Sequence, residues 1–141
     1  MKFKKYKLKE IIECYDKNRK PLSTMQRTNF KGEYPYYGAQ EIIDYVKDYL
    51  FDGKFILLAE DGENLRSKIK PIANIVSGKF WLNNHAHIFK TKIGFNMEYL
   101  CYYLNNIDIS GYITGTTQPK LNQSNMNNID IILPSKKIKI R

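Results

Sequence analysis

Residues 111–134, GYITGTTQPKLNQSNMNNIDIILP, gather the side chains best suited to molecular recognition in this sequence. Three threonine hydroxyls, which can donate or accept hydrogen bonds, surround Gly115, a residue that tolerates the positive φ of a tight turn. Pro119 fixes its own φ and favours an extended Gln118, so an amide and the Lys120 ammonium project from a stiff loop. Hydrogen bonding and positive charge suit a polar, anionic partner.

Predicted loops elsewhere in the chain carry the same polar and basic side chains. Eight cations are candidates for neutralising phosphates: Arg27, Lys31, Arg66, Lys68, Lys70, Lys90, Lys92 and Lys120. Five hydroxyl or amide residues are candidates for contacts with base edges or nearby polar groups: Asn84, Thr116, Thr117, Gln118 and Asn122. Loops from one rigid sheet can converge on one face, which would then read DNA. The alternative is a solvated edge that binds nothing.

Two histidines raise the possibility of a metal site. His85 and His87 lie two residues apart, which on a strand puts both rings on one face, where they could supply two zinc ligands. Zinc sites need three or four ligands, and the sequence offers no obvious third. A structural or surface role is therefore favoured for both histidines.

A short motif with an acidic residue raises the alternative that the protein is an enzyme. Asp52, Gly53 and Lys54 resemble half of a metal-dependent nuclease site, with Asp44 or Asp61 as partner. Two-metal catalysis requires several converging carboxylates, whereas an Asp-Gly turn before a strand explains these residues without chemistry. The sequence also has no recognisable nucleophile with its base and no glycine-rich phosphate loop. We therefore predict no catalytic residue, no metal and no cofactor.

The composition is that of a basic globular domain. With 141 residues, 43% of them hydrophobic, the chain is long enough to bury one core. Its formal net charge of +9 favours an anionic partner, and lysines and arginines crowd residues 2–9 and 136–141. Cys14 and Cys101 are expected to be free thiols in a reducing cytoplasm, and no apolar run is long enough for a membrane span.

The pattern of apolar residues predicts a mixed α/β (α+β) fold, with a twisted mixed sheet and a few short helices. Helices are expected over residues 6–15 and over residues 97–104, where Asn96 is the candidate N-cap. Residues 16–33 are expected to form a loop or a ragged hairpin, and residues 63–71 are expected to form a loop. Strands are expected over residues 54–60, 86–89 and 129–133, and as a pair over residues 72–76 and 80–82. Strands are also favoured over residues 40–51, although a helix suits that pattern too.

Several motifs together resemble a known family. They are YPYYGAQ at residues 34–40, IIDY at 42–45, YLFDG at 49–53, LLAEDG at 57–62, NHAH at 84–87, GTTQPKL at 115–121 and IDI at 129–131. In this order, and with the helix over residues 99–104, they resemble the target recognition domain of type I restriction-modification specificity subunits. The resemblance covers about residues 6–134.

The resemblance implies a double-stranded DNA recognition domain without catalysis of its own. Such a domain reads one half of a bipartite target, and the specificity subunit positions methyltransferase and endonuclease subunits on the DNA. Residues that read the target differ between members of the family, so the candidates named above rest on loop chemistry alone.

The extent of the sequence leads to a second functional hypothesis. A specificity subunit resembles two recognition domains separated by long helices, whereas residues 1–141 are expected to form one domain with its core at residues 6–134, without the spacer helix or a second domain. The alternative function is therefore a protein-interaction module, a degenerate or half subunit that binds a methyltransferase subunit or a second copy of itself. A small metal-dependent nuclease is the third hypothesis.

Overall fold

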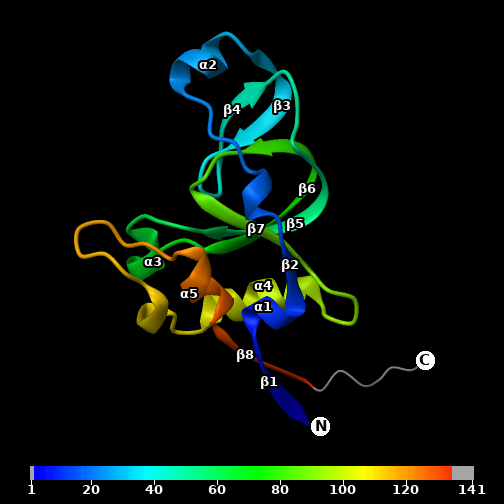
Figure 1. Cartoon of the computed structure of the whole chain (residues 1–141), viewed down its shortest axis with the longest axis vertical. Helices are drawn as coiled ribbons and strands as arrows, with labels where there is room; N and C mark the ends of the chain where they lie inside the picture. The colour runs from blue at the N-terminus through cyan, green and yellow to red at the C-terminus, as the bar shows by residue number, and fades with distance from the viewer. Residues whose placement is uncertain (1, 135–141) are drawn as a thin grey trace.

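A six-stranded mixed sheet organises residues 2–134, the part of the chain that the computed structural model describes (Figure 1). Its strands are β2 Ile12–Cys14, β3 Lys31–Tyr37, β4 Ile42–Val46, β5 Phe51–Ala59, β6 Ala73–Leu82 and β7 Ala86–Thr91. They lie in the order β2, β7, β5, β6, β3, β4. All neighbours are antiparallel except β3 and β6, which pair in parallel. The predicted mixed sheet is confirmed.

A two-stranded antiparallel sheet forms the end of the molecule opposite β3 and β4 (Figure 1). It joins β1 (Phe3–Lys7) to β8 (Asp130–Pro134), with Tyr6 opposite Ile131. The strand predicted over residues 129–133 is thus confirmed. The cations of residues 136–141 lie outside the described residues.

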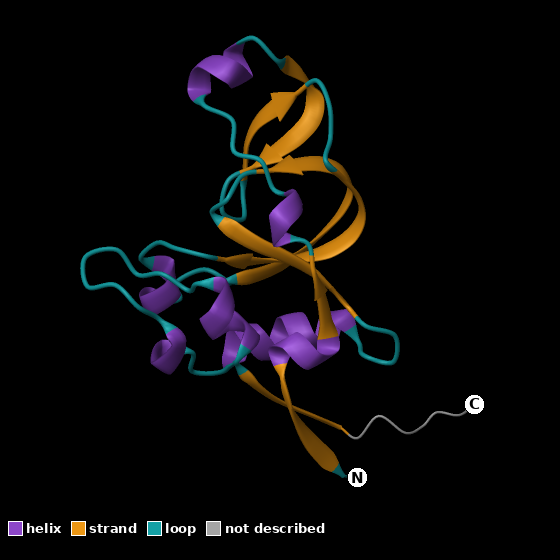
Figure 2. Ribbon diagram, viewed as in Figure 1, coloured by secondary structure: helices purple, strands orange, loops and turns teal. Residues whose placement is uncertain are grey.

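The helices of the described residues are short. They are α1 Leu8–Ile11, α2 Thr24–Thr28, α3 Asn64–Ser67, α4 Met97–Asn106 and α5 Gln123–Asn127, with 3-10 turns η1 Asp16–Asn18 and η2 Ser110–Tyr112. Figure 2 shows α1, α4 and α5 between the two sheets, whereas α2 lies beside β3 and β4 at the far end. The helix predicted over residues 97–104 is confirmed, and the Asn96 side chain caps it by accepting the Tyr99 N–H at 2.7 Å.

The central strand β5 is buried on both faces because each face meets a separate core. Phe55 and Leu57 enter one cluster of buried side chains, whereas Ile56 and Leu58 enter the larger cluster shared with α1, α4, α5 and β8. This alternation is the two-residue period of a strand, and it explains the continuous apolar run in the sequence. The strand predicted over residues 54–60 is confirmed and extends further toward the N-terminus.

The turns predicted at Asp52-Gly53 and at residues 77–79 are wrong. Both lie inside long strands, where Gly53 of β5 stands opposite Gly78 of β6. Their φ values are 146° and 100°, conformations that suit glycine, so the paired glycines let both strands bend without ending. One continuous strand β6 therefore replaces the strand pair expected over residues 72–76 and 80–82.

Predictions for the N-terminal half fail where tertiary pairing or capping decides the structure. A helix over residues 6–15 is wrong, because β1 pairs with β8 and β2 with β7, and only α1 remains helical. The loop expected over residues 16–33 contains α2, which Ser23 caps by accepting the Gln26 N–H at 3.1 Å. The loop expected over residues 63–71 contains α3.

Three smaller expectations can be compared with the structure. The preference for strands over residues 40–51 is confirmed by β4 and the start of β5. Cys14 and Cys101 are both free, as expected. Among residues 2–134, no helix is long and apolar enough to cross a membrane.

Candidate nucleic-acid interface

Residues 114–120, called here the hydroxyl loop, form a closed loop that projects from the molecule beside α3 (Figure 1). Its ends are joined by two backbone hydrogen bonds of 2.8 Å, between the N–H and C=O groups of Thr114 and Lys120. Gly115 has a φ of 87°, and a Cβ there would lie 2.2 Å from the Gln118 carbonyl oxygen. Only glycine fits this turn without strain, as the sequence predicted.

Arg66 of α3 holds the turn from the side. Its guanidinium donates to the Gly115 carbonyl at 2.5 Å and to the Thr116 carbonyl at 3.3 Å. The neighbouring Lys68, which ends α3 with a φ of 50°, donates through its ammonium to the Ile107 carbonyl at 2.6 Å. Both predicted phosphate ligands therefore fasten backbone segments of the chain to one another.

The base of the hydroxyl loop is joined to the end of β5 and to α5. The Gly62 N–H donates to the Pro119 carbonyl at 3.0 Å, and the Leu121 N–H donates to the Glu60 carbonyl at 2.7 Å. Asn122 caps α5 by accepting the Asn125 N–H at 2.8 Å. The side-chain oxygen of Asn122, a candidate for base contacts, is therefore already engaged within the fold.

The tip of the hydroxyl loop presents three polar side chains to solvent. Thr116, Thr117 and Gln118 are all exposed. Within the described part of the chain their side chains make no hydrogen bond, although the backbone beneath them is held at several points. These side chains can exchange water for an external donor or acceptor without breaking a contact of the fold.

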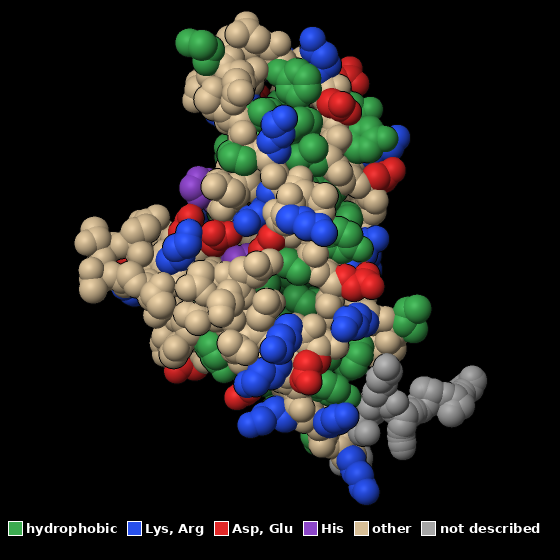
Figure 3. Space-filling model, in the orientation of Figure 1, with side chains coloured by type: hydrophobic (Ala, Val, Ile, Leu, Met, Phe, Trp, Pro, Cys, Tyr) green, Lys and Arg blue, Asp and Glu red, His purple; other side chains and the backbone are tan. Residues whose placement is uncertain are grey.

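The surface beside this loop is concave. Figure 3 shows the molecule hollowed between the lobe of α2, β3 and β4 and the lobe that carries α3 and the hydroxyl loop. Acidic, basic and histidine side chains gather in the hollow, so its charge is mixed rather than uniformly positive. An anionic partner at this face would meet ion-paired cations.

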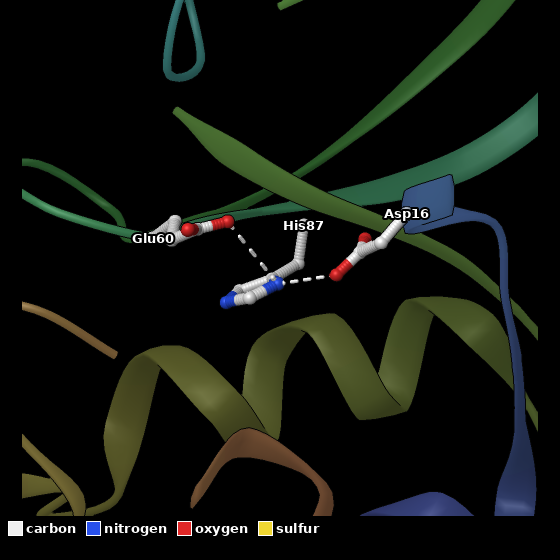
Figure 4. A group of neighbouring side chains, drawn as sticks. All are labelled: Asp16, Glu60 and His87. Atoms are coloured by element: carbon white, nitrogen blue, oxygen red, sulfur yellow. Dashed lines mark hydrogen bonds and ion pairs between the residues drawn. The ribbon is translucent and has the colours of Figure 1, made fainter. Parts of the chain in front are cut away.

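A buried cluster of charges lies under the hydroxyl loop. His87 of β7 lies between Asp16 of η1 and Glu60, with its Nδ1 2.6 Å from Asp16 Oδ2 and 3.7 Å from Glu60 Oε1 (Figure 4). Arg19 donates to Glu60 at 2.6 Å and to the Ala86 carbonyl at 2.9 Å. Lys120, the last residue of the loop, lies 3.1 Å from Glu60 Oε2.

The two carboxyl groups of this cluster remain ionised near neutral pH. Burial by itself raises the pKa of Asp16, but the hydrogen bond and charge of His87, the Ile88 N–H and Arg19 outweigh burial and lower it. Burial likewise acts to raise the pKa of Glu60, and hydrogen bonds from Arg19 and Lys120 outweigh it, so this pKa is also lowered. The cluster is a set of charge-assisted bonds between distant segments.

Asp16, Glu60 and His87 are near enough to one another to hold a metal ion, but their ligand atoms already have partners. The two ring nitrogens of His87 contact Asp16 and, at 2.6 Å, the Leu121 carbonyl oxygen. Arg19 occupies Glu60, and its positive charge would oppose a cation there. The residues fit a structural network better than a metal site.

The zinc and nuclease alternatives find little support in the geometry. The exposed ring of His85 contacts Asp61 at 2.9 Å, whereas His87 is buried among other partners. Lys54 pairs with Glu98, and Gly53 lies within the sheet rather than in a turn.

The candidate residues divide into groups. Arg66, Lys68, Thr116, Thr117, Gln118, Lys120 and Asn122 gather at or beside the hydroxyl loop. Asn84 is exposed next to His85, whose partner Asp61 forms a bridge with Lys120. The structure therefore brings eight of the thirteen candidates to one region.

The remaining five candidates lie elsewhere. Arg27 and Lys31 both pair with Asp44, at 3.1 Å and 2.8 Å, in the lobe of α2, β3 and β4. Lys70 pairs with Glu41 at 2.5 Å. Lys90 lies near the C-terminal end of β7, and Lys92 directly follows that strand. The Lys90 ammonium lies 4.8 Å from the centre of the Phe55 ring. Whether any of the thirteen contacts DNA stays a prediction.

Sequence reasoning assigned no role to Asp16, Arg19 or Glu60. The pairs that they form join residues far apart in the chain: Arg19 and Glu60 are 41 positions apart, and Asp16 and His87 are 71 positions apart. No local spacing signals such contacts. An acid and an arginine three residues apart in a polar segment were the available hint, and that pattern is common on surfaces.

The sequence of this chain matches a known protein family and two relatives. The family model described as "Type I restriction modification DNA specificity domain" matches residues 1–140. A putative type I restriction enzyme specificity subunit of Haemophilus influenzae is 35% identical over 127 residues, which are 90% of this chain and 32% of that protein. The Escherichia coli EcoprrI specificity subunit is 24% identical over 102 residues, 72% of this chain and 24% of its own length.

Solved structures of the same class share the fold. The S subunit of a type I restriction-modification system from M. genitalium has a TM-score of 0.73 at 12% identity, covering 94% of this chain and 34% of that one. The HsdS subunit of Thermoanaerobacter tengcongensis has a TM-score of 0.59 at 14% identity, covering 94% and 33%. The chain spans between about a quarter and a third of these proteins.

The match is to a specificity domain, the non-catalytic class that the sequence predicts. Both the family model and the relative from Haemophilus influenzae cover most of the chain. The chain belongs to the family of type I restriction-modification DNA specificity domains.

Proposed function

We propose that this domain reads one half of a bipartite double-stranded DNA target and performs no catalysis of its own. The observation that carries the proposal is the hydroxyl loop, whose tip exposes Thr116, Thr117 and Gln118 on a backbone held by Arg66 and β5. A rigid loop with unengaged donors and acceptors can discriminate base edges, because little entropy is lost when it binds.

The side chains at the tip are matched to base-edge chemistry. Gln118 has both an amide donor and an amide acceptor and can bond adenine through two atoms, while threonine hydroxyls can bond either kind of edge and threonine methyl groups can contact thymine. Pro119 is buried, which holds Gln118 at the surface. The loop is therefore suited to direct readout in the major groove.

The ion-paired lysines supply the contacts to phosphates in this proposal. The side chains of Lys31, Lys70 and Lys120 remain 59%, 65% and 48% exposed although each contacts a carboxylate. A phosphate oxygen can replace or share such a contact at small cost, since exposed ion pairs contribute little to stability. Binding should then weaken steeply as salt rises.

We place the domain in a larger assembly because its relatives are longer. Residues 1–141 would form a single recognition domain with its core at residues 6–134, and other parts of a specificity subunit would supply the second half-site. One similar structure comes from work on complex assembly of the type I restriction-modification system. Methyltransferase and endonuclease subunits are the proposed partners.

A selection experiment tests the function. The purified protein is incubated with a random duplex DNA library at low and at near-physiological salt, and the retained DNA is sequenced. Enrichment of one short motif that persists at the higher salt supports base readout. Binding without a motif, collapsing as salt rises, would contradict it, because only the electrostatic attraction would remain.

A protein-interaction module is the second candidate, and exposed apolar side chains favour it. Tyr99 and Tyr102 of α4 and Ile132 of β8 are 41%, 67% and 46% exposed, and the Tyr103 hydroxyl joins the two elements through the Ile132 N–H. This function predicts co-elution with a methyltransferase subunit or as a dimer. A monomeric elution profile in both experiments would count against it.

A further inference from the structure

His87 has a hydrogen-bonding arrangement that constrains its protonation. Its side chain is buried, with 1% of the residue exposed, and both ring nitrogens have close partners. Nδ1 lies 2.6 Å from Asp16 Oδ2, and Nε2 lies 2.6 Å from the Leu121 carbonyl oxygen. A carbonyl oxygen can only accept, so Nε2 must carry a proton.

The partner of Nδ1 is also an acceptor. Asp16 accepts the Ile88 N–H at 2.8 Å through its other oxygen, and Arg19 lies 4.0 Å away, so the carboxylate form is favoured. An ionised carboxylate can only accept, which requires a proton on Nδ1 as well. With both nitrogens donating, the ring is an imidazolium.

The surrounding charges can accommodate this cation. Asp16 and Glu60 supply two negative charges within 4 Å of the ring, at 2.6 Å and 3.7 Å. Arg19 contacts the same Glu60 oxygen that faces the ring, and Lys120, whose side chain is 48% exposed, contacts the other Glu60 oxygen. Two carboxylates thus face three cations, one of which is solvated, and burial of the imidazolium is compensated.

The group that accepts from Nε2 lies next to the hydroxyl loop. Leu121 follows Lys120 directly, its side chain is fully buried, and its N–H bonds the Glu60 carbonyl at 2.7 Å. The Leu121 peptide groups are therefore held on both sides, by β5 through the N–H and by His87 through the carbonyl. A change at His87 acts on the C-terminal end of the loop.

We propose that His87 is the positioning residue of the hydroxyl loop: its doubly protonated ring fastens the Leu121 carbonyl to Asp16 and thereby sets where the loop stands. If the His87 ring loses one proton, one of its nitrogens becomes an acceptor. That nitrogen then faces another acceptor, and the hydrogen bond between them is lost. The proton on Nδ1 is retained, because a hydrogen bond to the charged Asp16 carboxylate is stronger than one to a neutral carbonyl. The bond from Nε2 to the Leu121 carbonyl is therefore the one that is lost. The C-terminal end of the loop is then held less firmly, because the Leu121 carbonyl has lost its donor.

The first test uses the unmodified chain and does not depend on DNA. Nitrogen NMR of the histidine side chains is expected to show both nitrogens of His87 protonated near neutrality. Exchange protection of the Thr114, Lys120 and Leu121 amides should fall about fivefold or more once His87 loses its proton, the effect of one hydrogen bond of roughly 1 kcal/mol. A neutral His87 ring at pH 7, or amide protection that does not depend on the protonation of that ring, would overturn the proposal.

Matched variants separate positioning from general stability. His87→Gln keeps a donor near the Nε2 position and has no titrating proton, so loop protection should stay high and lose its dependence on pH. His87→Asn reaches only the Nδ1 position, so loop protection should fall at every pH while core amides such as Ile56 stay protected. His85→Gln, two residues away and exposed, is the control and should change neither quantity.

The consequence for DNA rests on the proposed function and is measured separately. Binding of a duplex recovered by selection should weaken at higher pH for the unmodified chain and remain flat for His87→Gln. If the loop responds to His87 but no motif is ever selected, the proposed function fails and the positioning role stands. If a motif is selected and loop protection is unaffected by His87→Asn, the positioning role is wrong.

Discussion

Two polar loops of this domain are anchored in different ways. The hydroxyl loop ends in Lys120, which contacts the buried cluster that contains Asp16 and His87, whose side chains are 4% and 1% exposed. The turn between β3 and β4 has a largely exposed ion pair, in which the Glu41 and Lys70 side chains are 68% and 65% exposed. Both regions are rich in charge, but only buried and mutually bonded charges fix the position of a backbone.

The largest expected effect comes from removing the acid at the centre of the buried cluster. Asp16→Ala leaves the His87 Nδ1 and the Ile88 N–H without their acceptor and removes a charge 4.0 Å from Arg19, which should lower the free energy of unfolding by about 3–5 kcal/mol. Urea denaturation measures the change. Glu41→Ala is the control and should change stability very little, since its partner is solvated. Equal effects of the two variants would erase the contrast between the loops.

A smaller effect is expected from the turn of the hydroxyl loop. Gly115→Ala places a Cβ 2.2 Å from the Gln118 carbonyl oxygen and forces a φ of 87° on alanine, at a cost of roughly 1–3 kcal/mol. The variant should also bind the selected DNA sequences more weakly, because Gln118 must shift to make room for the new Cβ. Gly111→Ala is the matched control, since a Cβ there meets no described atom within 4 Å and φ is not positive. Thermal unfolding and motif selection on both variants make the comparison.

Gln118→Ala should affect recognition without affecting folding. The side chain is exposed and makes no hydrogen bond within residues 2–134, so the melting temperature should be unchanged. Discrimination at one base pair of a selected target should fall by about 1–3 kcal/mol, while affinity for other sequences is retained. Lys120→Ala should instead weaken all sequences alike and reduce the salt dependence. Equal loss at every position for Gln118→Ala would remove it from base readout.

The smallest expected effect is the loss of stability at acidic pH. The pKa values of Asp16 and Glu60 are lowered in the folded chain, so their stabilising contribution is fully present above their unfolded values near 4 and is lost as pH falls through the folded values. Unfolding free energy should therefore fall below about pH 4, and Asp16→Asn should flatten that decline. Urea denaturation at a series of acidic pH values tests the slope. A decline equally steep in Asp16→Asn would assign it to other groups.

Local patterns predicted the elements whose structure is decided locally. The helix capped by Asn96, the strand around Phe55 and the turn at Gly115 follow from a cap, an apolar run between polar breaks, and a glycine among hydroxyls. The continuous β6 did not follow, because Gly78 reads as a turn unless its partner Gly53 on the next strand is known. Glycine pairs of this kind are a tertiary feature.

The candidate site was predictable in its exposed part and hidden in its buried part. Thr116, Thr117 and Gln118 were recognised by residue type and lie at the loop tip as expected. The partners of the cations were not predictable. Arg66 donates hydrogen bonds to backbone carbonyls of the hydroxyl loop, and Lys120 pairs with Glu60, 60 positions away in the sequence. Residue type shows which side chains can bind an anion, whereas burial and long-range pairing determine which of them are already engaged.

The central claim is that the hydroxyl loop is the part of this domain that meets DNA bases, and NMR of the amide-labelled chain with a selected duplex tests it most directly. The largest shifts, persisting at near-physiological salt, are expected at Thr116, Thr117 and Gln118, with smaller shifts at the exposed Asn84. The β1–β8 sheet and α4 should remain unperturbed. Shifts confined to Tyr102 and Ile132, with the loop unchanged, would contradict the claim and identify the apolar face of α4 and β8 as the working surface.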